Sequence, residues 1–189
     1  GEDRTKGEII LACCQKLSAQ ETGILVAFGK ERVKVYKKPV IGIISTGDEV
    51  VKINKTPGPG HIRNINTYTL SGMVQKAGGI PLSFGIVQDN FDDLFDKCSQ
   101  ALAKSDMVLI SGGSSVGARD FTIEVLSSLP ESKILVHGVS ISPGKPTILA
   151  RAGNKAFWGL PGHVVSAMIV FEVVVRPFIE KIGGLSDQH

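Results

Sequence analysis

The chain has 189 residues, of which 42% are hydrophobic and 21% are charged, and its formal net charge is +3. This size and balance are typical of a folded domain and not of a disordered chain, and no apolar run approaches the roughly 20 residues that span a bilayer, so we expect no membrane association. The mild charge, with two tyrosines and one tryptophan for base stacking, also argues against a nucleic-acid partner.

The three cysteines predict no disulfide framework, because their number is odd and none of them has metal-ligand spacing. Reduced thiols and the lack of a secretory signal indicate a cytoplasmic protein. The chain starts at Gly1 without a methionine, so we expect it to be an excised fragment of a longer protein.

Residues 1–39 differ from the rest of the chain and are expected to be a lead-in segment of helix and strand. Residues 6–11 predict a short strand, and a capping box at Ser18 and Glu21 predicts a helix that stops at Gly29. The alternation over residues 32–36 predicts a second strand with a basic, solvated face. The segment has too few apolar residues for a core of its own, so it is an accessory layer or a piece of a larger domain.

An alternation of strands and helices begins after Pro39. Strands are expected over 40–44, 80–87, 107–110, 134–136, 146–150 and 156–158, and helices over 66–77, from Asn90 to about 102, 120–129 and 163–182. This order predicts an α/β fold with a mostly parallel sheet covered on both faces. The boundaries are a domain over 40–184 and a tail over 185–189.

The most informative stretch is L-I-S-G-G-S-S-V-G-A-R-D at 109–120. A buried strand that ends in a glycine-rich turn before a helix presents backbone N–H groups to an anion, and glycine allows a phosphate to approach the backbone. The stretch is neither a Walker A loop nor the G-x-G-x-x-G dinucleotide motif. A tight turn without a ligand explains it equally well when it is considered alone.

Acidic residues follow three successive predicted strands: Asp48 and Glu49, then Asp89, then Asp120. Each of them has a local explanation as a turn or cap residue, but together they predict an acidic rim at one edge of the sheet. Acids beside an anion site are compatible if a divalent cation such as Mg²⁺ bridges them to a phosphate, or if some of them contact donors on a heterocycle. Both explanations favour a phosphorylated small molecule as the ligand.

Two further turns contribute candidates. P-G-K-P at 143–146 holds Lys145 in a rigid turn where its ammonium suits an oxyanion, although an exposed loop lysine is an equal alternative. G-L-P-G at 159–162 leads into the last predicted helix and places backbone amides at its start.

Several stretches together resemble the molybdopterin-binding domain of molybdopterin molybdotransferase, of the MoeA and gephyrin E-domain type. They are S-T-G-D-E-V at 45–50, N-I-N at 64–66, G-I-V-Q-D at 85–89, S-G-G at 111–113, S-V-G at 115–117 with Asp120, and the turns at 143–146 and 159–162 with V-S-A at 165–167. The match covers nearly the whole chain, with 40–184 as the binding domain.

The resemblance implies a three-layer α/β/α domain and the Mg²⁺-dependent insertion of molybdate into adenylylated molybdopterin. Glu49, Asp89 and Asp120 are implied as catalytic and metal-binding acids. The implied substrate-binding residues are Asp48, Ser111, Gly112, Gly113, Ser115, Gly117, Lys145, Pro161 and Gly162. The family is about twice as long and forms a homodimer, so we expect this fragment alone to be inactive.

Other functions stay open at this point. The first is a molybdopterin adenylyltransferase of the MogA type, against which the turns at 143–146 and 159–162 argue. The second is a non-catalytic molybdopterin-binding or scaffold module. Ser142, where the family often has lysine, and His163-Val164, where it usually has Asn-Pro, leave substrate preference open, and the sequence does not separate molybdenum from tungsten.

Overall fold

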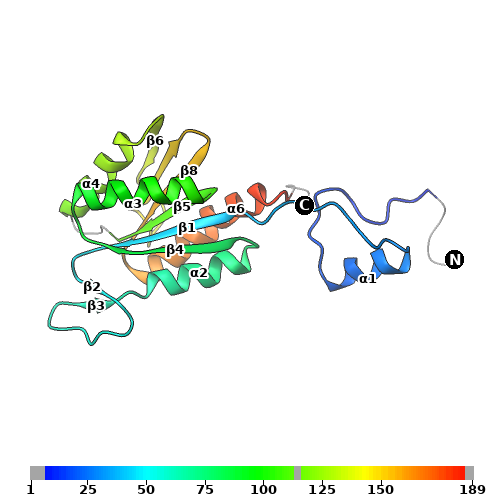
Figure 1. The fold of residues 1–189 in the computed structure, drawn as a ribbon, viewed down its shortest axis with the longest axis horizontal. Coiled ribbons are helices and arrows are strands. Elements are labelled where there is room, and N and C mark those ends of the chain that lie inside the picture. Colours follow the sequence, from blue (N-terminus) through cyan, green and yellow to red (C-terminus); the bar gives the residue numbers. More distant parts are fainter. Residues whose placement is uncertain (1–6, 113–115, 186–189) are drawn as a thin grey trace.

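The computed structural model describes residues 7–112 and 116–185, with side chains from residue 121 onward in the second range. A six-stranded sheet with the order β4-β1-β5-β8-β7-β6 forms the centre of the domain (Figure 1). The strands are β1 (Val40–Thr46), β4 (Ile80–Val87), β5 (Met107–Ser111), β6 (Ser132–His137), β7 (Ile148–Ala152) and β8 (Lys155–Leu160). β4, β1, β5 and β8 are parallel, whereas β7 is antiparallel to both of its neighbours.

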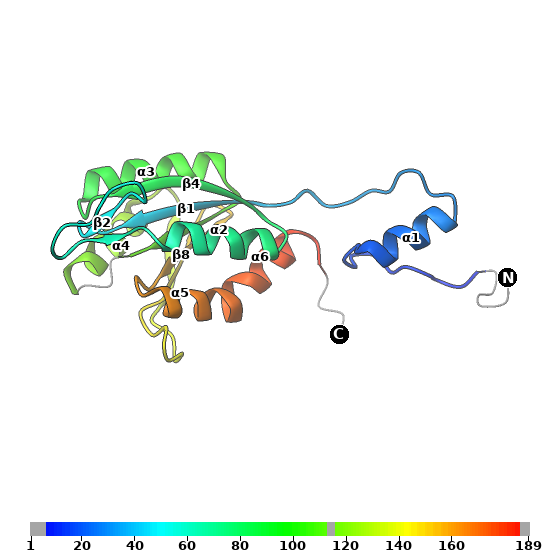
Figure 2. The same cartoon turned by 90° about the horizontal axis from the view of Figure 1, so that it is seen from below.

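Helices cover both faces of this sheet (Figure 2). They are α2 (Asn66–Lys76), α3 (Phe91–Lys104), α4 (Val116–Ser128), and a long C-terminal helix made of α5 (Val164–Val170), a π-helical turn η1 (Phe171–Val175) and α6 (Arg176–Ile182). α3 packs beside α4 on one face, and α2 packs beside α5 on the other. The expected α/β fold with a mostly parallel sheet is confirmed.

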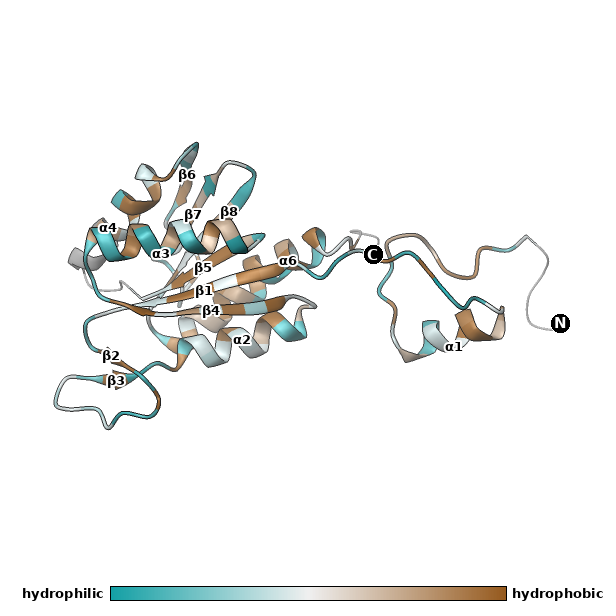
Figure 3. Cartoon of the chain, in the orientation of Figure 1, coloured by the Kyte–Doolittle hydropathy of each residue, from teal (hydrophilic) through white to brown (hydrophobic). Residues whose placement is uncertain are grey.

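The strand residues alternate between two buried cores, as a sheet covered on both faces requires. Ile41 and Ile43 of β1 face the core under α2 and α5, whereas Ile44 faces the core under α3 and α4. Figure 3 shows these apolar strands in the interior of the domain. Both cores are continuous, so β1 and β5 are held rigidly up to their carboxyl ends.

The chain reverses its direction of travel across the sheet between β1 and β5. It passes from β1 to β4 on one side, and then returns past β1 to β5 on the other side. The connecting helices α2 and α3 therefore lie on opposite faces and diverge at the carboxyl ends of β1 and β5. In open parallel sheets this point of divergence leaves a crevice in which ligands bind.

Residues 7–39 form an arm that extends away from the domain (Figures 1 and 2). The predicted helix is present as α1 (Ala19–Ala27), and Ser18 with Glu21 forms the predicted capping box. The strands expected at 6–11 and 32–36 were wrong for the residues described there, because none of these residues is in a strand. A strand needs a partner for its backbone groups. Val33 and Val35 alternate with charged residues, but they and Tyr36 lie exposed, and no described strand pairs with this segment.

Two helix predictions also need correction. α4 begins at Val116, four residues before the expected start at Asp120. The long C-terminal helix carries a π-helical turn in its middle, and Arg176 bonds Glu172 and Glu180 at 2.9 Å on either side of that junction.

In the part of the chain that the structure describes, no helix combines the length and the apolar character needed to cross a membrane.

Candidate functional site

A pocket of about 240 Å³ opens at the carboxyl ends of β1 and β5, at the crevice that the topology creates. Its wall comes from the ends of these two strands, the short strands β2 (Val50–Val51) and β3 (Ile62–Arg63), the start of α2 and the turn after β8. The lining residues are Ser45, Thr46, Glu49, Val50, Ile62, Arg63, Asn64, Ile65, Asn66, Ser111, Gly112, Gly162, His163 and Val164. The structure thus brings together four of the predicted site residues: Glu49, Ser111, Gly112 and Gly162.

Gly112 is the point at which the two strand ends meet. It has a φ of +129°, and a Cβ built on it would lie 2.0 Å from the carbonyl oxygen of Thr46. Only glycine fits this contact, because any side chain would overlap the backbone of β1. Gly112 lines the pocket, and its N–H donates to the Leu160 carbonyl of the neighbouring strand at 3.5 Å.

Asn66, the first residue of α2, joins the two sides of the pocket. Its side-chain Nδ2 donates to Ser111 Oγ at 2.6 Å and to the Gly162 carbonyl oxygen at 2.8 Å. These bonds connect α2 to the end of β5 and to the turn after β8. Asn66 was not among the predicted site residues, although it stands in the N-I-N stretch of the sequence.

A second set of side-chain hydrogen bonds joins the end of β1 to the start of α2 beside the pocket. Ser45 Oγ donates to Asn64 Oδ1 at 3.0 Å and lies 2.8 Å from Thr67 Oγ1. Asn64 Nδ2 also donates to Thr67 Oγ1 at 2.9 Å. All three side chains are buried, so this network fixes the start of α2 against the end of β1.

Two polar atoms in the pocket wall are buried and have no hydrogen-bond partner among the residues that the structure describes. They are Thr46 Oγ1 and Asn66 Oδ1. Leaving such a group unpaired costs about 1–3 kcal/mol, so unpaired buried groups are rare in proteins and concentrate where a ligand or water completes them. Both atoms lie in residues that line the same pocket.

The outer wall of the pocket is a short parallel ribbon of β2 (Val50–Val51) and β3 (Ile62–Arg63). Its pairing is set by the backbone, since Ile62 N donates to the Glu49 carbonyl at 2.8 Å. The ribbon places Arg63 on the rim of the pocket, where its guanidinium donates through Nε to the Ile53 carbonyl at 3.3 Å. Arg63 adds a positive charge that the sequence reasoning missed, because the loop of residues 52–61 carries no periodic pattern.

Three of the predicted acids lie together at the ends of β1 and β4. The backbone N–H of Asp89 donates to Asp48 Oδ1 at 3.1 Å. Partial burial raises the pKa of Asp89, and the negative charges of Asp48 and Glu49 raise it further. Three of the four acids of the predicted rim thus lie close enough to repel one another, and of these Glu49 lines the pocket.

No three His, Cys, Asp or Glu side chains within the described ranges are grouped closely enough to enclose a metal ion. Mg²⁺ usually keeps several waters and takes only one or two carboxylates together with substrate phosphates, so an enclosing group of this kind is not required for it. The carboxylates of Asp48, Glu49 and Asp89 supply the oxygen ligands that this cation prefers, and their mutual repulsion would be relieved by it.

The other predicted residues are placed as follows. Lys145 is exposed in the loop between β6 and β7, outside the pocket wall, and Pro161 is buried directly after β8. Gly113 and Ser115 lie outside the described residues. Gly117 and Asp120 lie in the first turns of α4, and their side chains are outside the described part, so the predicted roles of these four residues stay predictions.

Comparison with known proteins finds one family model and several related sequences that match most of this chain. Residues 42–181 match the family model described as a probable molybdopterin binding domain. The chain is 39% identical over 95% of its length to the molybdopterin molybdenumtransferase of Nostoc sp., and 34% identical over 97% of its length to that of Haemophilus influenzae. It covers 42% and 45% of these proteins, so it spans less than half the length of these curated relatives.

A solved structure shows the same similarity in three dimensions. The molybdopterin biosynthesis MoeA protein from Pyrococcus horikosii superposes on 90% of this chain with a TM-score of 0.80 and 35% sequence identity. The superposition covers 42% of that protein.

Proposed function

This chain belongs to the molybdopterin-binding domain family, and from that premise we propose that it binds a phosphorylated molybdopterin in molybdenum cofactor biosynthesis. The observation that carries the proposal is the pocket at the carboxyl ends of β1 and β5. It combines the bare backbone of Gly112, the unpaired buried atoms of Thr46 and Asn66, and the charge of Arg63. A ligand that fits this wall carries both an anionic group and neutral hydrogen-bonding edges, as a pterin phosphate does.

The residues divide between these two parts of the ligand. The backbone of Gly112 and the guanidinium of Arg63 suit the phosphate or adenylate, because glycine admits close approach and arginine matches phosphate oxygens. Thr46 Oγ1 offers either a donor or an acceptor, and Asn66 Oδ1 offers an acceptor, to an uncharged heterocycle edge. We place Ser111 beside them as a donor whose hydroxyl is held in position by Asn66.

The reaction that we propose for the whole protein is the insertion of molybdate into adenylylated molybdopterin. It rests on relatives that are named molybdopterin molybdenumtransferase, of which this chain covers less than half. In that protein this domain supplies the pterin site, and a homodimer completes the cleft. The chain alone is proposed to bind its substrate without turning it over. Its three free cysteines suit a cytoplasmic setting.

We also propose that Mg²⁺ binds at the acidic rim, held by Asp48, Glu49 and Asp89 with Asp120 as a further ligand. When bound, the ion would offset the charge of the substrate phosphates and polarise the phosphoanhydride. The rigid ends of β1 and β4 would keep these acidic side chains at fixed positions beside the pterin pocket.

Titration calorimetry of the chain with adenylylated molybdopterin, with and without Mg²⁺, tests the proposal. We expect saturable binding of one ligand per chain, strengthened by Mg²⁺, and no release of AMP when molybdate is added to the isolated chain. The absence of binding in both conditions would contradict the pterin site. AMP transfer from ATP to molybdopterin would instead identify the adenylyltransferase alternative.

A further inference from the structure

The arm holds a pair of adjacent cysteines that the proposed function does not use. Cys13 and Cys14 have their sulfur atoms 3.3 Å apart, and Cys13 is exposed to solvent. Adjacent side chains in an extended chain point to opposite sides, so this proximity needs a special backbone. It is provided by a turn in which Cys14 has a φ of +62°, and Ala12 N donates to Gln15 Oε1 at 2.9 Å across that turn.

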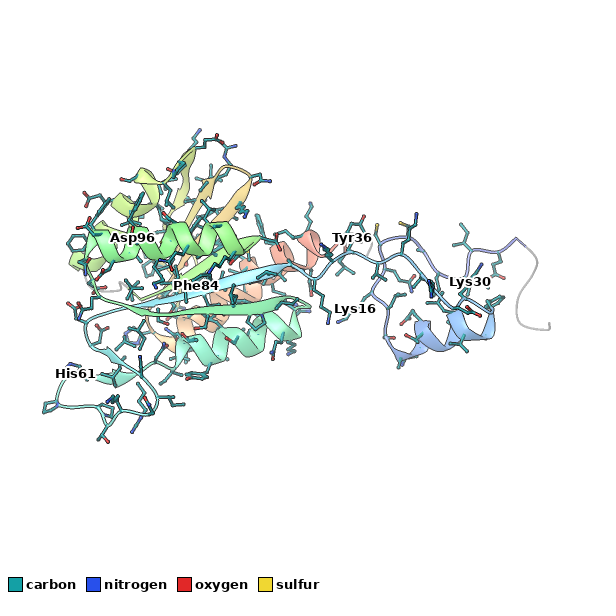
Figure 4. All side chains as sticks on the ribbon, in the orientation of Figure 1. Lys16, Lys30, Tyr36, His61, Phe84 and Asp96 are labelled. Atoms are coloured by element: carbon teal, nitrogen blue, oxygen red, sulfur yellow. The ribbon has the colours of Figure 1, made fainter. Side chains whose placement is uncertain are left out.

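Tyr36, in the segment that leads from the arm into the domain, lies beside this pair. Its hydroxyl lies 3.6 Å from Cys14 Sγ, so two segments 22 residues apart meet at the cysteines. Figure 4 shows Tyr36 and Lys16 where the arm returns to the domain. The ring of Tyr36 packs against Gly184, which fixes the phenol in place next to the pair.

The surroundings favour a negative charge on sulfur. The groove that contains both cysteines is also lined by Lys16, Lys34, Lys37 and Lys38, and its carboxylate Glu180 is bonded to Arg176. Hydrogen-bond donors to the sulfur lower a thiol's pKa and increase the fraction of reactive thiolate, and Tyr36 and Cys13 are the donors to Cys14.

The two thiols of the pair are not equivalent. Hydrogen bonds from Tyr36 and then from Cys13 lower the pKa of Cys14. The hydrogen bond with Cys14 raises the pKa of Cys13, and the charge of the Cys14 thiolate adds to this effect. The third cysteine, Cys98, is fully buried in the core, where burial raises its pKa to about 12. An accessible thiolate with a thiol neighbour in contact is the arrangement of a peroxide-reactive cysteine and its resolving partner.

We propose that Cys14 and Cys13 are a redox modification site that a hydroperoxide converts to an intramolecular disulfide. The Cys14 thiolate attacks one oxygen of the hydroperoxide, the O–O bond breaks, and the other oxygen leaves with a proton as an alcohol or water. The Cys14 sulfenic acid that results is attacked by the sulfur of Cys13, which forms the S–S bond and releases water. The two thiols lose two electrons, and the hydroperoxide accepts them.

The adjacency of the cysteines sets the character of this disulfide. Consecutive Cα atoms are about 3.8 Å apart, which is shorter than the separation in an unstrained disulfide, so the bond would be readily reduced. The site is therefore expected to be reversible under thiol reductants, unlike a structural bridge.

Hydrogen peroxide treatment of the folded chain followed by tryptic peptide mass analysis tests the site directly. Trypsin cuts after Lys6 and Lys16, so one peptide carries both cysteines, whereas cuts after Lys97 and Lys104 place Cys98 on another. We expect the first peptide to lose two hydrogens and both alkylation sites, and to recover them on reduction. Cys98 should remain alkylatable after unfolding.

Three variants make the assignment specific. Cys13→Ser is expected to accumulate a dimedone-reactive sulfenic acid on Cys14, because its resolving partner is gone. Cys14→Ser should react much more slowly at Cys13, and Tyr36→Phe should slow disulfide formation roughly threefold by removing one hydrogen bond to the thiolate. Disulfides only between chains, equal peroxide rates for Cys13 and Cys14, or thiols that stay reduced would overturn the proposal.

Discussion

The backbone of Thr46 lies directly against the α-carbon of Gly112, so that a methyl group on Gly112 would come within 2.0 Å of the Thr46 carbonyl oxygen and 2.6 Å of its Oγ1. This contact joins the ends of β1 and β5 at the pocket. It leaves no room for a side chain on Gly112, which lines the pocket together with Thr46. The contact is therefore both a packing constraint and a feature of the binding site.

Gly112→Ala is expected to destabilise the chain by about 2–4 kcal/mol, because it adds a backbone clash to a φ that alanine rarely adopts. Any folded protein that remains should have lost its affinity for adenylylated molybdopterin. Urea unfolding and calorimetry measure the two effects. Gly72→Ala is the matched control, since Gly72 is exposed in α2 with no atom near its missing Cβ. It should stabilise the chain by about 0.5–1 kcal/mol and leave binding unchanged.

Thr46→Val separates a ligand-binding hydroxyl from a structural one. Thr46 Oγ1 is buried without a partner among the described residues, so its replacement by a methyl group should change the free energy of unfolding by less than about 1 kcal/mol. The affinity for the pterin ligand should fall roughly tenfold, as expected for one lost buried hydrogen bond. Thr22→Val removes a hydroxyl that bonds the Ser18 carbonyl in α1, where neither residue lines the pocket, and should leave affinity intact. Unchanged affinity in Thr46→Val would contradict a role for Thr46 in binding.

Asn66→Ala removes both bonds that join α2 to Ser111 and Gly162. We expect a loss of about 1–3 kcal/mol in stability, because the Gly162 carbonyl and the Ser111 hydroxyl lose their partner. Ligand affinity should decrease further than stability explains, since Asn66 lines the pocket and we propose that its Oδ1 accepts a hydrogen bond from the ligand. Asn154→Ala, in the exposed turn between β7 and β8, is the control and should affect neither quantity. Full affinity in a folded Asn66→Ala protein would remove Asn66 from the site.

Asp89 makes stability depend on pH. Because its pKa is raised by burial and by the charges of Asp48 and Glu49, the folded chain holds this proton more tightly than the unfolded chain. Stability is therefore lost as the pH rises from the unfolded value of about 4 through the raised folded value. Asp89→Asn removes this loss and should gain about 0.5 kcal/mol at neutral pH, a small figure because the side chain is only partly buried.

Urea unfolding at a series of pH values measures this effect. The stability difference between Asp89→Asn and the parent should widen as the pH rises from 3.5 to 7, whereas Asp92→Asn, an exposed acid in the first turn of α3, should show no such gain. A difference that stays constant with pH would argue against the assigned cause. In calorimetry, Asp89→Asn should also remove the dependence of ligand binding on Mg²⁺.

The central strands and the glycine turn could be predicted because their signal is local. The buried runs of β1 and β5 are apolar at consecutive positions, and the two core faces follow from period two. The strand expected over residues 32–36 failed for the opposite reason: alternation predicts a half-buried surface, but pairing depends on a partner that the sequence does not show. The start of α4 was placed too late because the serines and glycines before Asp120 are typical of a loop.

The site residues were only partly predictable, because some of them reach the pocket through contacts between distant parts of the chain. Gly112 and Glu49 carry local signals, a strand-to-helix turn and a charge at a strand end. Arg63 and Asn66 reach the pocket through long-range contacts, the pairing of β2 with β3 and the bonds from α2 to the turn after β8. The N-I-N stretch was the available signal for Asn66, and no comparable pattern marks Arg63.

The most direct test of the account is amide NMR during titration with adenylylated molybdopterin in the presence of Mg²⁺. We predict that the largest shift changes occur at Thr46, Asn66 and Gly112, with smaller ones at Glu49 and Asp89, and that the arm residues around Tyr36 do not respond. Shift changes confined to the arm or to the opposite edge of the sheet, with Gly112 unaffected, would contradict the proposed pterin site.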